Sequence, residues 1–236
     1  MSYLLIIKTG STMPDLQDRH GDFEDWMIEA LAVDRTFIKT VDVSQGGTLP
    51  HYTELSGILI TGSHSMVTDQ HLWGEATADW LRIAVDKQIP ILGICYGHQL
   101  LAYALGGTVD YISDGREVGT IPVQIRPEAQ DDLLLHSLPP QTHVQLSHRQ
   151  AVIKLPPNVV WLASSDRVPH QAFRYGDCVW GMQFHPEFPT HVMQAYTHYA
   201  REGLRSEGFD PEAIAHQIQE TPVGFEIMQR FASLVF

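Results

Sequence analysis

The chain has 236 residues, of which 44% are hydrophobic and 18% are charged, and its formal net charge at pH 7 is −13. This composition is typical of a globular protein with enough residues for a substantial core. A general nucleic-acid-binding protein is excluded, because an acidic chain without clusters of Lys and Arg cannot neutralise many phosphates.

Three further features restrict the class of protein. The two cysteines, Cys95 and Cys178, are too few for a disulfide-stabilised secreted domain. The apolar run at residues 3–7 is too short for a signal peptide or a membrane span. The 13 histidines are scattered rather than set at metal-ligand spacing. We therefore expect a cytoplasmic protein without membrane contact, bound metal or cofactor.

The first half of the chain alternates strands and helices. Apolar runs predict strands at residues 3–8, 57–61 and 89–92, and a further strand is expected at 36–43. Helical spacing of apolar residues predicts helices near 23–30, 73–84 and 99–105. Gly106 and Gly107 can end the last of these helices. Buried strands that alternate with amphipathic helices indicate a parallel sheet covered on both faces.

The second half has shorter and less regular strands. We expect them at residues 108–112, 120–125, 159–163, 171–175 and 179–184, as an antiparallel extension of the same sheet. Pro189 and the pair Asp210-Pro211 can begin helices, and a last apolar stripe runs from Phe225 to Val235. The prediction is one domain over residues 1–236, with a core at about 1–190 and a helical C-terminal extension at about 190–236.

Cys95 carries the strongest functional signal. It lies between Gly93 and Gly97, after an apolar run and before a helical stretch. This arrangement is typical of a nucleophile elbow, in which a sharp turn strains the nucleophile and the glycines let strand and helix approach. The start of the helix favours a thiolate over a thiol. We expect Cys95 to be an activated, solvent-facing nucleophile.

His185 and Glu187 follow a predicted strand and could complete a catalytic triad. Side chains two residues apart at the end of a strand share a face, so Glu187 can orient the imidazole while its other nitrogen faces Cys95. The alternative is that His185 only caps the strand and Glu187 is solvated. The elbow earlier in the chain favours the triad.

An acyl-transfer site also needs N–H groups that stabilise a developing oxyanion. The geometry of an elbow supplies the N–H of Tyr96, the residue after the nucleophile. Gly62, which ends the strand before the elbow strand, is the candidate for the second donor. The alternative is that Gly62 serves only the turn.

Two motifs together resemble those of class I glutamine amidotransferases. They are residues 93–101 (GICYGHQLL) with the sequence ALGG at 104–107, and residues 183–187 (QFHPE). Their spacing and the Gly62 loop match as well, so the resemblance covers roughly residues 1–190. Residues 116–119 (REVG) resemble the amidotransferase domain of GMP synthetase, and residues 21–23 (GDF) resemble freestanding amidotransferases and plant-type γ-glutamyl peptidases.

The resemblance implies a fold and an activity. The fold would be α/β, a flavodoxin-like three-layer sandwich with a largely parallel central sheet. Cys95 would attack the side-chain amide of glutamine, form a γ-glutamyl thioester and release ammonia, with His185 moving protons and Glu187 holding its tautomer. Gln99 matches a position that contacts bound glutamine in relatives, although a surface amide is the alternative. His98 is predicted to pack in the helix, and Cys178 to be a buried strand thiol without chemistry.

Residues 147–149 depart from the pattern of the family. Relatives carry Ser-His-Gly or Asn-His-Gly there, and the loop binds the α-amino and α-carboxylate groups of glutamine. Ser147 and His148 match this pattern, but Arg149 replaces the glycine. An arginine could crowd the pocket, or it could pair with a carboxylate on a larger γ-glutamyl substrate.

Three functions follow as hypotheses. The first is a glutaminase-type hydrolase whose ammonia acceptor would be a separate synthase subunit, because the chain has no glycine-rich nucleotide motif of its own. The second is a γ-glutamyl peptidase or hydrolase that acts on a conjugate. The third is a non-catalytic regulatory or binding subunit, against which the presence of Cys95, His185 and Glu187 argues.

Overall fold

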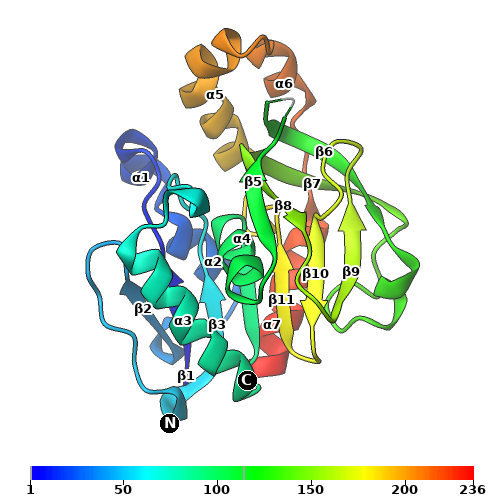
Figure 1. Ribbon diagram of the computed structural model, residues 1–236. Coiled ribbons are helices and arrows are strands. Elements are labelled where there is room, and N and C mark those ends of the chain that lie inside the picture. Colours follow the sequence, from blue (N-terminus) through cyan, green and yellow to red (C-terminus); the bar gives the residue numbers. More distant parts are fainter. Residues whose placement is uncertain (1, 114) are drawn as a thin grey trace.

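A nine-stranded sheet crosses the molecule in the order β2-β1-β3-β4-β11-β10-β9-β6-β7 (Figure 1). The computed structural model describes residues 2–113 and 115–236. The strands of this sheet are β1 (Tyr3–Lys8), β2 (Ile38–Asp42), β3 (Leu55–Ile60), β4 (Ile91–Ile94), β6 (Glu117–Ile125), β7 (Gln141–His148), β9 (Val159–Ser164), β10 (Ala172–Tyr175) and β11 (Val179–Met182). A second sheet pairs β5 (Thr108–Tyr111) with β8 (Gln150–Lys154).

The α-helices of the described residues are α1 (Pro14–His20), α2 (Phe23–Leu31), α3 (Leu72–Asp86), α4 (Tyr96–Ala104), α5 (Thr190–Ser206), α6 (Pro211–Gln217) and α7 (Pro222–Val235). Short 3₁₀ helices lie at Arg35–Phe37, Tyr52–Glu54, Val67–Asp69 and Pro127–Asp131. Among the described helices, none is both long and apolar enough to cross a membrane.

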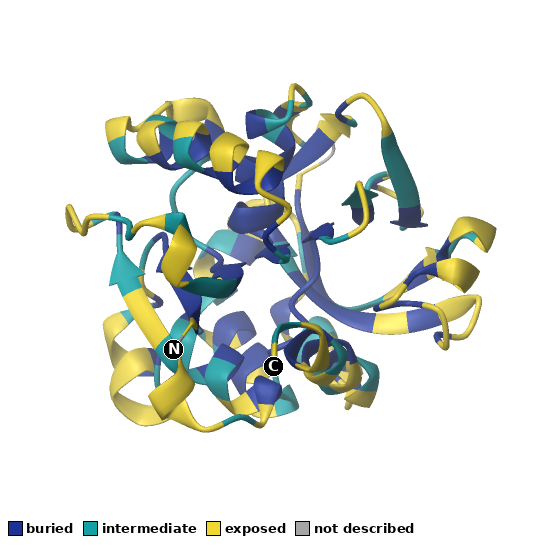
Figure 2. Cartoon of the chain, turned by 90° about the horizontal axis from the view of Figure 1, so that it is seen from below, coloured by how far each residue is buried: buried dark blue, intermediate teal, exposed yellow. Residues whose placement is uncertain are grey.

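The parallel half of the sheet contains β2, β1, β3, β4 and β11. Successive side chains of a strand point to opposite faces, and both faces of β1 are covered. Leu4 and Ile6 pack in the cluster that holds residues of α2 and α7, and Leu5 and Ile7 pack in the cluster that holds residues of α3 and α4. Figure 2 shows the burial of the central strands between the helices. The fold is therefore a flavodoxin-like three-layer α/β sandwich, as predicted.

The antiparallel half contains β10, β9, β6 and β7, and it confirms the predicted extension of the sheet. Two details of the prediction were wrong. Residues 108–111 pair with β8 rather than with the main sheet, and strands β7 and β8 were missed. Strand β7 buries polar side chains, and Gln145 among them is held by a hydrogen bond to the Gln219 carbonyl oxygen at 2.9 Å. Its sequence therefore lacks the apolar pattern of a buried strand.

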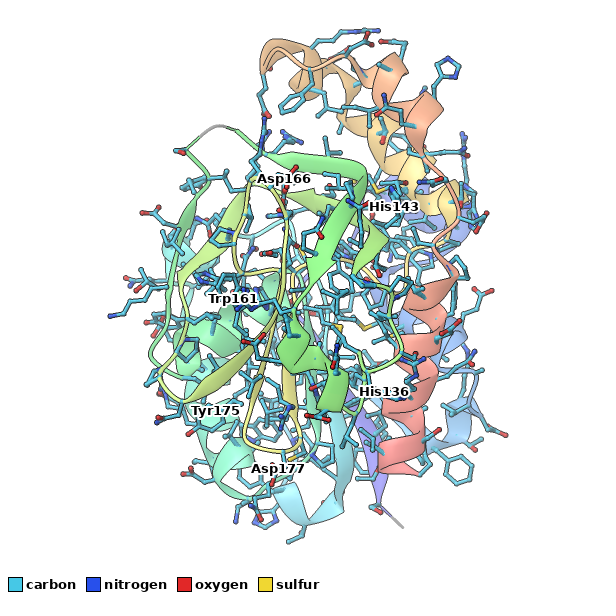
Figure 3. All side chains as sticks on the ribbon, turned by 90° about the vertical axis from the view of Figure 1, so that its right-hand side faces the viewer. His136, His143, Trp161, Asp166, Tyr175 and Asp177 are labelled. Atoms are coloured by element: carbon cyan, nitrogen blue, oxygen red, sulfur yellow. The ribbon has the colours of Figure 1, made fainter. Side chains whose placement is uncertain are left out.

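Helices α5 and α6 lie beyond the carboxyl ends of the parallel strands, at the top of Figure 1, and both chain termini lie at the opposite end. Apolar side chains of α1, α2, α5 and the loop before α5 form a third cluster there, which includes Phe23, Trp26, Phe188 and Tyr196. Figure 3 shows the side with the antiparallel strands, where Trp161 lies midway along the sheet and Asp177 lies at the end far from α5. Ligands of open parallel sheets bind at the carboxyl ends of the strands, and this is where α5 lies.

Candidate active site

Cys95 lies in the single-residue junction between β4 and α4. Its backbone has φ 53° and ψ −104°, a conformation that is unfavourable for a residue with a side chain. Neighbouring strands hold this turn, since the Cys95 N–H donates to the Met182 carbonyl oxygen at 2.8 Å. The prediction of a solvent-facing nucleophile was only partly right, because Cys95 is only 6% exposed and is reached through a pocket.

The two glycines of the motif are explained by close backbone approach. A Cβ atom on Gly93 would lie 2.5 Å from the Gly97 carbonyl oxygen, and a Cβ atom on Gly97 would lie 2.6 Å from the Ile60 carbonyl oxygen. Real Cβ atoms do not approach backbone oxygens so closely. The glycines therefore set the separation of α4 from β3 and β4, and with it the position of Cys95.

His185 and Glu187 lie in the loop that follows β11. The Nδ1 atom of His185 is 2.8 Å from Oε1 of Glu187, and both side chains are buried. The backbone N–H of His185 donates to the Gln145 carbonyl oxygen at 2.9 Å. The Phe188 ring stacks on the imidazole with 3.9 Å between ring centroids. The orientation of the imidazole is thus fixed by a carboxylate, a strand and an aromatic ring.

The electrostatics of this group favour the protonated imidazole. Burial by itself would lower the pKa of His185, but the Glu187 carboxylate and the Cys95 side chain outweigh this effect and raise the pKa well above its usual range. A cationic imidazole that is paired with a carboxylate stabilises a thiolate beside it.

Gly62 and Tyr96 both lie next to the nucleophile. A Cβ atom on Gly62 would be 3.1 Å from Cε1 of His185 and 3.7 Å from Cβ of Cys95. The hydroxyl group of Thr9 donates to the Gly62 carbonyl oxygen at 3.1 Å and fixes this turn. Tyr96 begins α4, where the first N–H groups have no acceptor within the helix. Both residues that were predicted to donate to an oxyanion therefore lie beside Cys95.

A pocket of about 310 Å³ opens onto Cys95. It lies between the loop after β3, the start of α4, the ends of β7 and β8, and helix α5. Most of the side chains in its walls are polar or aromatic, and the lining residues are Met13, Ser63, His64, Ser65, Met66, Cys95, Tyr96, Gln99, Arg116, Ser147, His148, Arg149, Gln150, Tyr196, Tyr199 and Ala200. All four predicted substrate-binding residues, Gln99, Ser147, His148 and Arg149, belong to this set.

Gln99 is buried rather than a surface amide. Its Nε2 donates to the Gln150 carbonyl oxygen at 2.7 Å and to Oε1 of Gln183 at 2.9 Å. Both amide hydrogens are therefore engaged by the protein, and among the described residues Oε1 has no donor. This oxygen is the atom of Gln99 that can accept a hydrogen bond in the pocket.

Residues 147–149, at the junction of β7 and β8, are held by contacts of His148 and Arg149 with two carboxylates. The Nε2 atom of His148 is 3.0 Å from Oε2 of the buried Glu117, and its Nδ1 is 2.8 Å from the Gln150 carbonyl oxygen. Arg149 does not fill the pocket, because its Nη2 donates to Oε1 of Glu207 at 2.7 Å and its side chain is 48% exposed.

Sequence reasoning did not identify His64, Tyr196 and Thr12 as neighbours of the site. The Thr12 hydroxyl donates to the Tyr196 oxygen at 3.1 Å, and that oxygen lies 3.4 Å from Nε2 of His64. Burial lowers the pKa of His64 and raises that of Tyr196. No motif links the three residues, because they lie far apart in the sequence and meet only through the packing of α5.

Two other expectations concern residues outside the pocket. His98 packs in the core as predicted, with its ring 5.1 Å from that of Phe173. Cys178 is not a buried strand thiol: it lies half-buried in the turn before β11. The described residues contain no group of three or more His, Cys, Asp or Glu side chains placed to hold a metal ion.

With this geometry in view, the class of protein is clear. The family model for glutamine amidotransferase class-I matches residues 16–199. The chain is also 32% identical over 171 residues to one of the subunits of the glutamine-hydrolyzing GMP synthase of Halobacterium salinarum, a match that covers 72% of this chain and 86% of the relative. The chain belongs to the class I glutamine amidotransferase family.

Other similarities agree with this assignment. The chain is 37% identical over 135 residues to the glutamine-hydrolyzing GMP synthase of Porphyromonas gingivalis, and it spans 24% of the length of that protein. A glutamine amidotransferase structure from Thermotoga maritima superposes with a TM-score of 0.77 at 20% identity over 100% of this chain and 99% of the other. One from Methylobacillus flagellatus has a TM-score of 0.74 at 22% identity, over 100% of this chain and 92% of the other. The two structures support the fold.

Proposed function

We propose that the protein hydrolyses a γ-glutamyl amide bond, with free glutamine as the default substrate and glutamate and ammonia as products. The observation that carries this proposal is the strained Cys95 turn in a pocket beside His185, whose other side is held by Glu187 at 2.8 Å. Membership of the family supports it. Cys95, His185 and Glu187 would act as nucleophile, proton carrier and orienting carboxylate.

The proposed reaction has two steps. The Cys95 thiolate attacks the amide carbon, the oxyanion accepts hydrogen bonds from the N–H groups of Gly62 and Tyr96, and His185 gives its proton to the departing ammonia. Water then attacks the thioester, His185 takes a proton from it, and glutamate leaves as the sulfur departs. The surroundings of His185 suit this order of steps, because its raised pKa favours the ion pair of imidazolium and Cys95 thiolate at the start of the cycle.

The destination of the ammonia is a separate part of the proposal. The Halobacterium salinarum relative is by name one of the subunits of a GMP synthase, and this chain is similar in extent to it. We infer that a separate synthase subunit can receive the ammonia from this chain. Glutamine hydrolysis that is weak for the isolated protein and rises when such a synthase is added would support this arrangement.

The second candidate function is hydrolysis of a γ-glutamyl conjugate. The observation that favours it is Arg149, which lines the pocket and leaves space in it. The chemistry at Cys95 would be unchanged, and only the departing amine would be larger. A regulatory subunit without activity is disfavoured because the strained cysteine turn and the buried His185–Glu187 pair both persist.

The test is to measure ammonia and glutamate release by the purified protein from glutamine, γ-glutamyl peptides and γ-glutamyl amines. The Cys95→Ala variant is the negative control, and Cys178→Ser controls for the loss of a thiol far from the pocket. Turnover of glutamine that is lost in Cys95→Ala supports the glutaminase, and preference for a conjugate supports the second candidate. Undiminished turnover by Cys95→Ala would contradict both.

A further inference from the structure

Three charged side chains form a cluster beside the pocket on the side of α5, and two of them, Arg116 and Arg149, line the pocket. Arg116 precedes β6, Arg149 lies between β7 and β8, and Glu207 follows the last residue of α5. Arg116 donates from Nε and Nη2 to the two carboxylate oxygens of Glu207, at 2.6 Å each, and Arg149 donates from Nη2 to one of them at 2.7 Å. Two guanidinium groups therefore share one carboxylate.

The two guanidinium groups lie close together. A Cβ atom on Gly203 of α5 would be 3.9 Å from Nη2 of Arg116 and equally 3.9 Å from Nη2 of Arg149. The two positively charged guanidinium groups repel each other, and the single negative charge of Glu207 compensates only one of the two positive charges. Glu207 stays ionised, because its hydrogen bond with Arg116 lowers its pKa. The cluster thus leaves one positive charge at the pocket of a chain whose net charge is −13.

The two arginines differ in how fully they are occupied. Arg116 is 8% exposed and binds Glu207 through two of its N–H groups in a fork-shaped pair. Arg149 is half exposed, and its guanidinium makes one hydrogen bond among the described residues. A guanidinium has five N–H donors, so Arg149 retains donors for a ligand. Its planar group is suited to hold a carboxylate through two parallel hydrogen bonds.

We propose that Arg149, positioned by the Arg116–Glu207 ion pair, binds a carboxylate group of the substrate. This inference rests on the proposed hydrolysis of γ-glutamyl amides and specifies the substrate that the pocket selects. The carboxylate can come from two places: the α-carboxylate of the γ-glutamyl group, or a carboxylate on the departing amine. Glu207 lies outside residues 16–199, which match the family model. The cluster therefore depends on the C-terminal segment of this chain.

Two matched pairs of substrates test the inference. Glutamine and its α-carboxamide differ only in the α-carboxylate, and γ-glutamylglycine and γ-glutamylglycinamide differ only in the carboxylate of the departing amine. One of the two pairs differs at the carboxylate that Arg149 binds. In that pair, we expect the wild type to have the higher kcat/KM for the carboxylate member, the substrate that carries the carboxylate. Arg149→Ala should lower kcat/KM for that member by about 10- to 100-fold, mainly through KM, and leave the carboxamide member nearly unchanged.

Further variants separate recognition from structure. Arg149→Lys keeps the charge but loses the fork, so it should restore part of the lost preference. Glu207→Gln releases both arginines and should weaken the preference without abolishing turnover of the carboxamide. Arg205→Ala is the matched control, because it removes an exposed arginine of α5 that pairs with Glu212 and does not line the pocket.

The outcomes are distinct. If the wild type turns over these amides but prefers neither carboxylate, or if Arg149→Ala lowers all four rates equally in a folded protein, the inference is overturned while the proposed hydrolysis stands. If the wild type cleaves none of the four, the proposed hydrolysis is contradicted, and the inference with it. Should Arg149→Ala fail to fold, the partial recovery expected of Arg149→Lys decides the question.

Discussion

Glu187→Gln removes one charge from the candidate site with little change of shape. In the wild type, Oε1 of Glu187 lies 2.8 Å from Nδ1 of His185, and both side chains are almost completely buried. At an effective dielectric constant of about 20, two unit charges about 4 Å apart attract each other by about 4 kcal/mol. This energy corresponds to about a thousandfold in an equilibrium, so we expect kcat/KM to fall by about 10²- to 10³-fold.

The same substitution should alter the pH profile in one direction. Since Glu187 raises the pKa of His185, the wild-type imidazolium survives as the pH rises, until the pH passes that raised value. Without the carboxylate the imidazolium is lost at a lower pH, and the alkaline limb of the kcat/KM profile moves down. Ammonia release measured across the pH range checks this, with the exposed Glu226→Gln as the isosteric control. A variant that keeps the wild-type rate and an unshifted alkaline limb would refute the reasoning.

Three further predictions concern the support of the site. Gly97→Ala forces a Cβ atom to 2.6 Å from the Ile60 carbonyl oxygen, and differential scanning calorimetry should show a Tm lower by roughly 2–12 °C, for a cost of about 1–3 kcal/mol. Phe188→Leu removes the ring stacked on His185, so kcat should fall by about 2- to 10-fold at nearly constant KM; an unchanged kcat would show that the stack is dispensable. Burial lowers the pKa of His98 to about 3 from its ordinary 6.5, so between pH 6.5 and about pH 3 His98 is protonated only in the unfolded chain. The stability of the fold therefore falls as the pH drops through this range. The Tm of His98→Leu should depend less steeply on pH than that of the wild type.

The parts of the site that could be predicted are local in sequence. The elbow is specified within five residues, because Gly93 and Gly97 are each required by contacts with neighbouring backbone. The His185–Glu187 contact joins residues two apart. The alternation of strands and helices in the first half predicted the parallel sheet, since the central strands β1, β3 and β4 are largely apolar.

The parts that could not be predicted depend on long-range packing. The partner of Arg149 is Glu207, which is 58 residues further along the chain and follows a helix whose packing beside the pocket the sequence did not reveal. The contact between Tyr196 and His64 spans 132 residues. Strand β7 was missed because its buried side chains include polar ones, Gln145 among them, that are stabilised by hydrogen bonds from the folded chain.

The central claim is that Cys95 becomes covalently linked to the γ-glutamyl group during turnover. Intact-mass spectrometry of protein quenched in acid during reaction with glutamine tests this most directly. The account predicts a mass increase of one γ-glutamyl group that maps to the peptide with Cys95, persists in Cys178→Ser and is absent from Cys95→Ala. Release of ammonia at the full rate with no such adduct, or an adduct elsewhere in the chain, would contradict it.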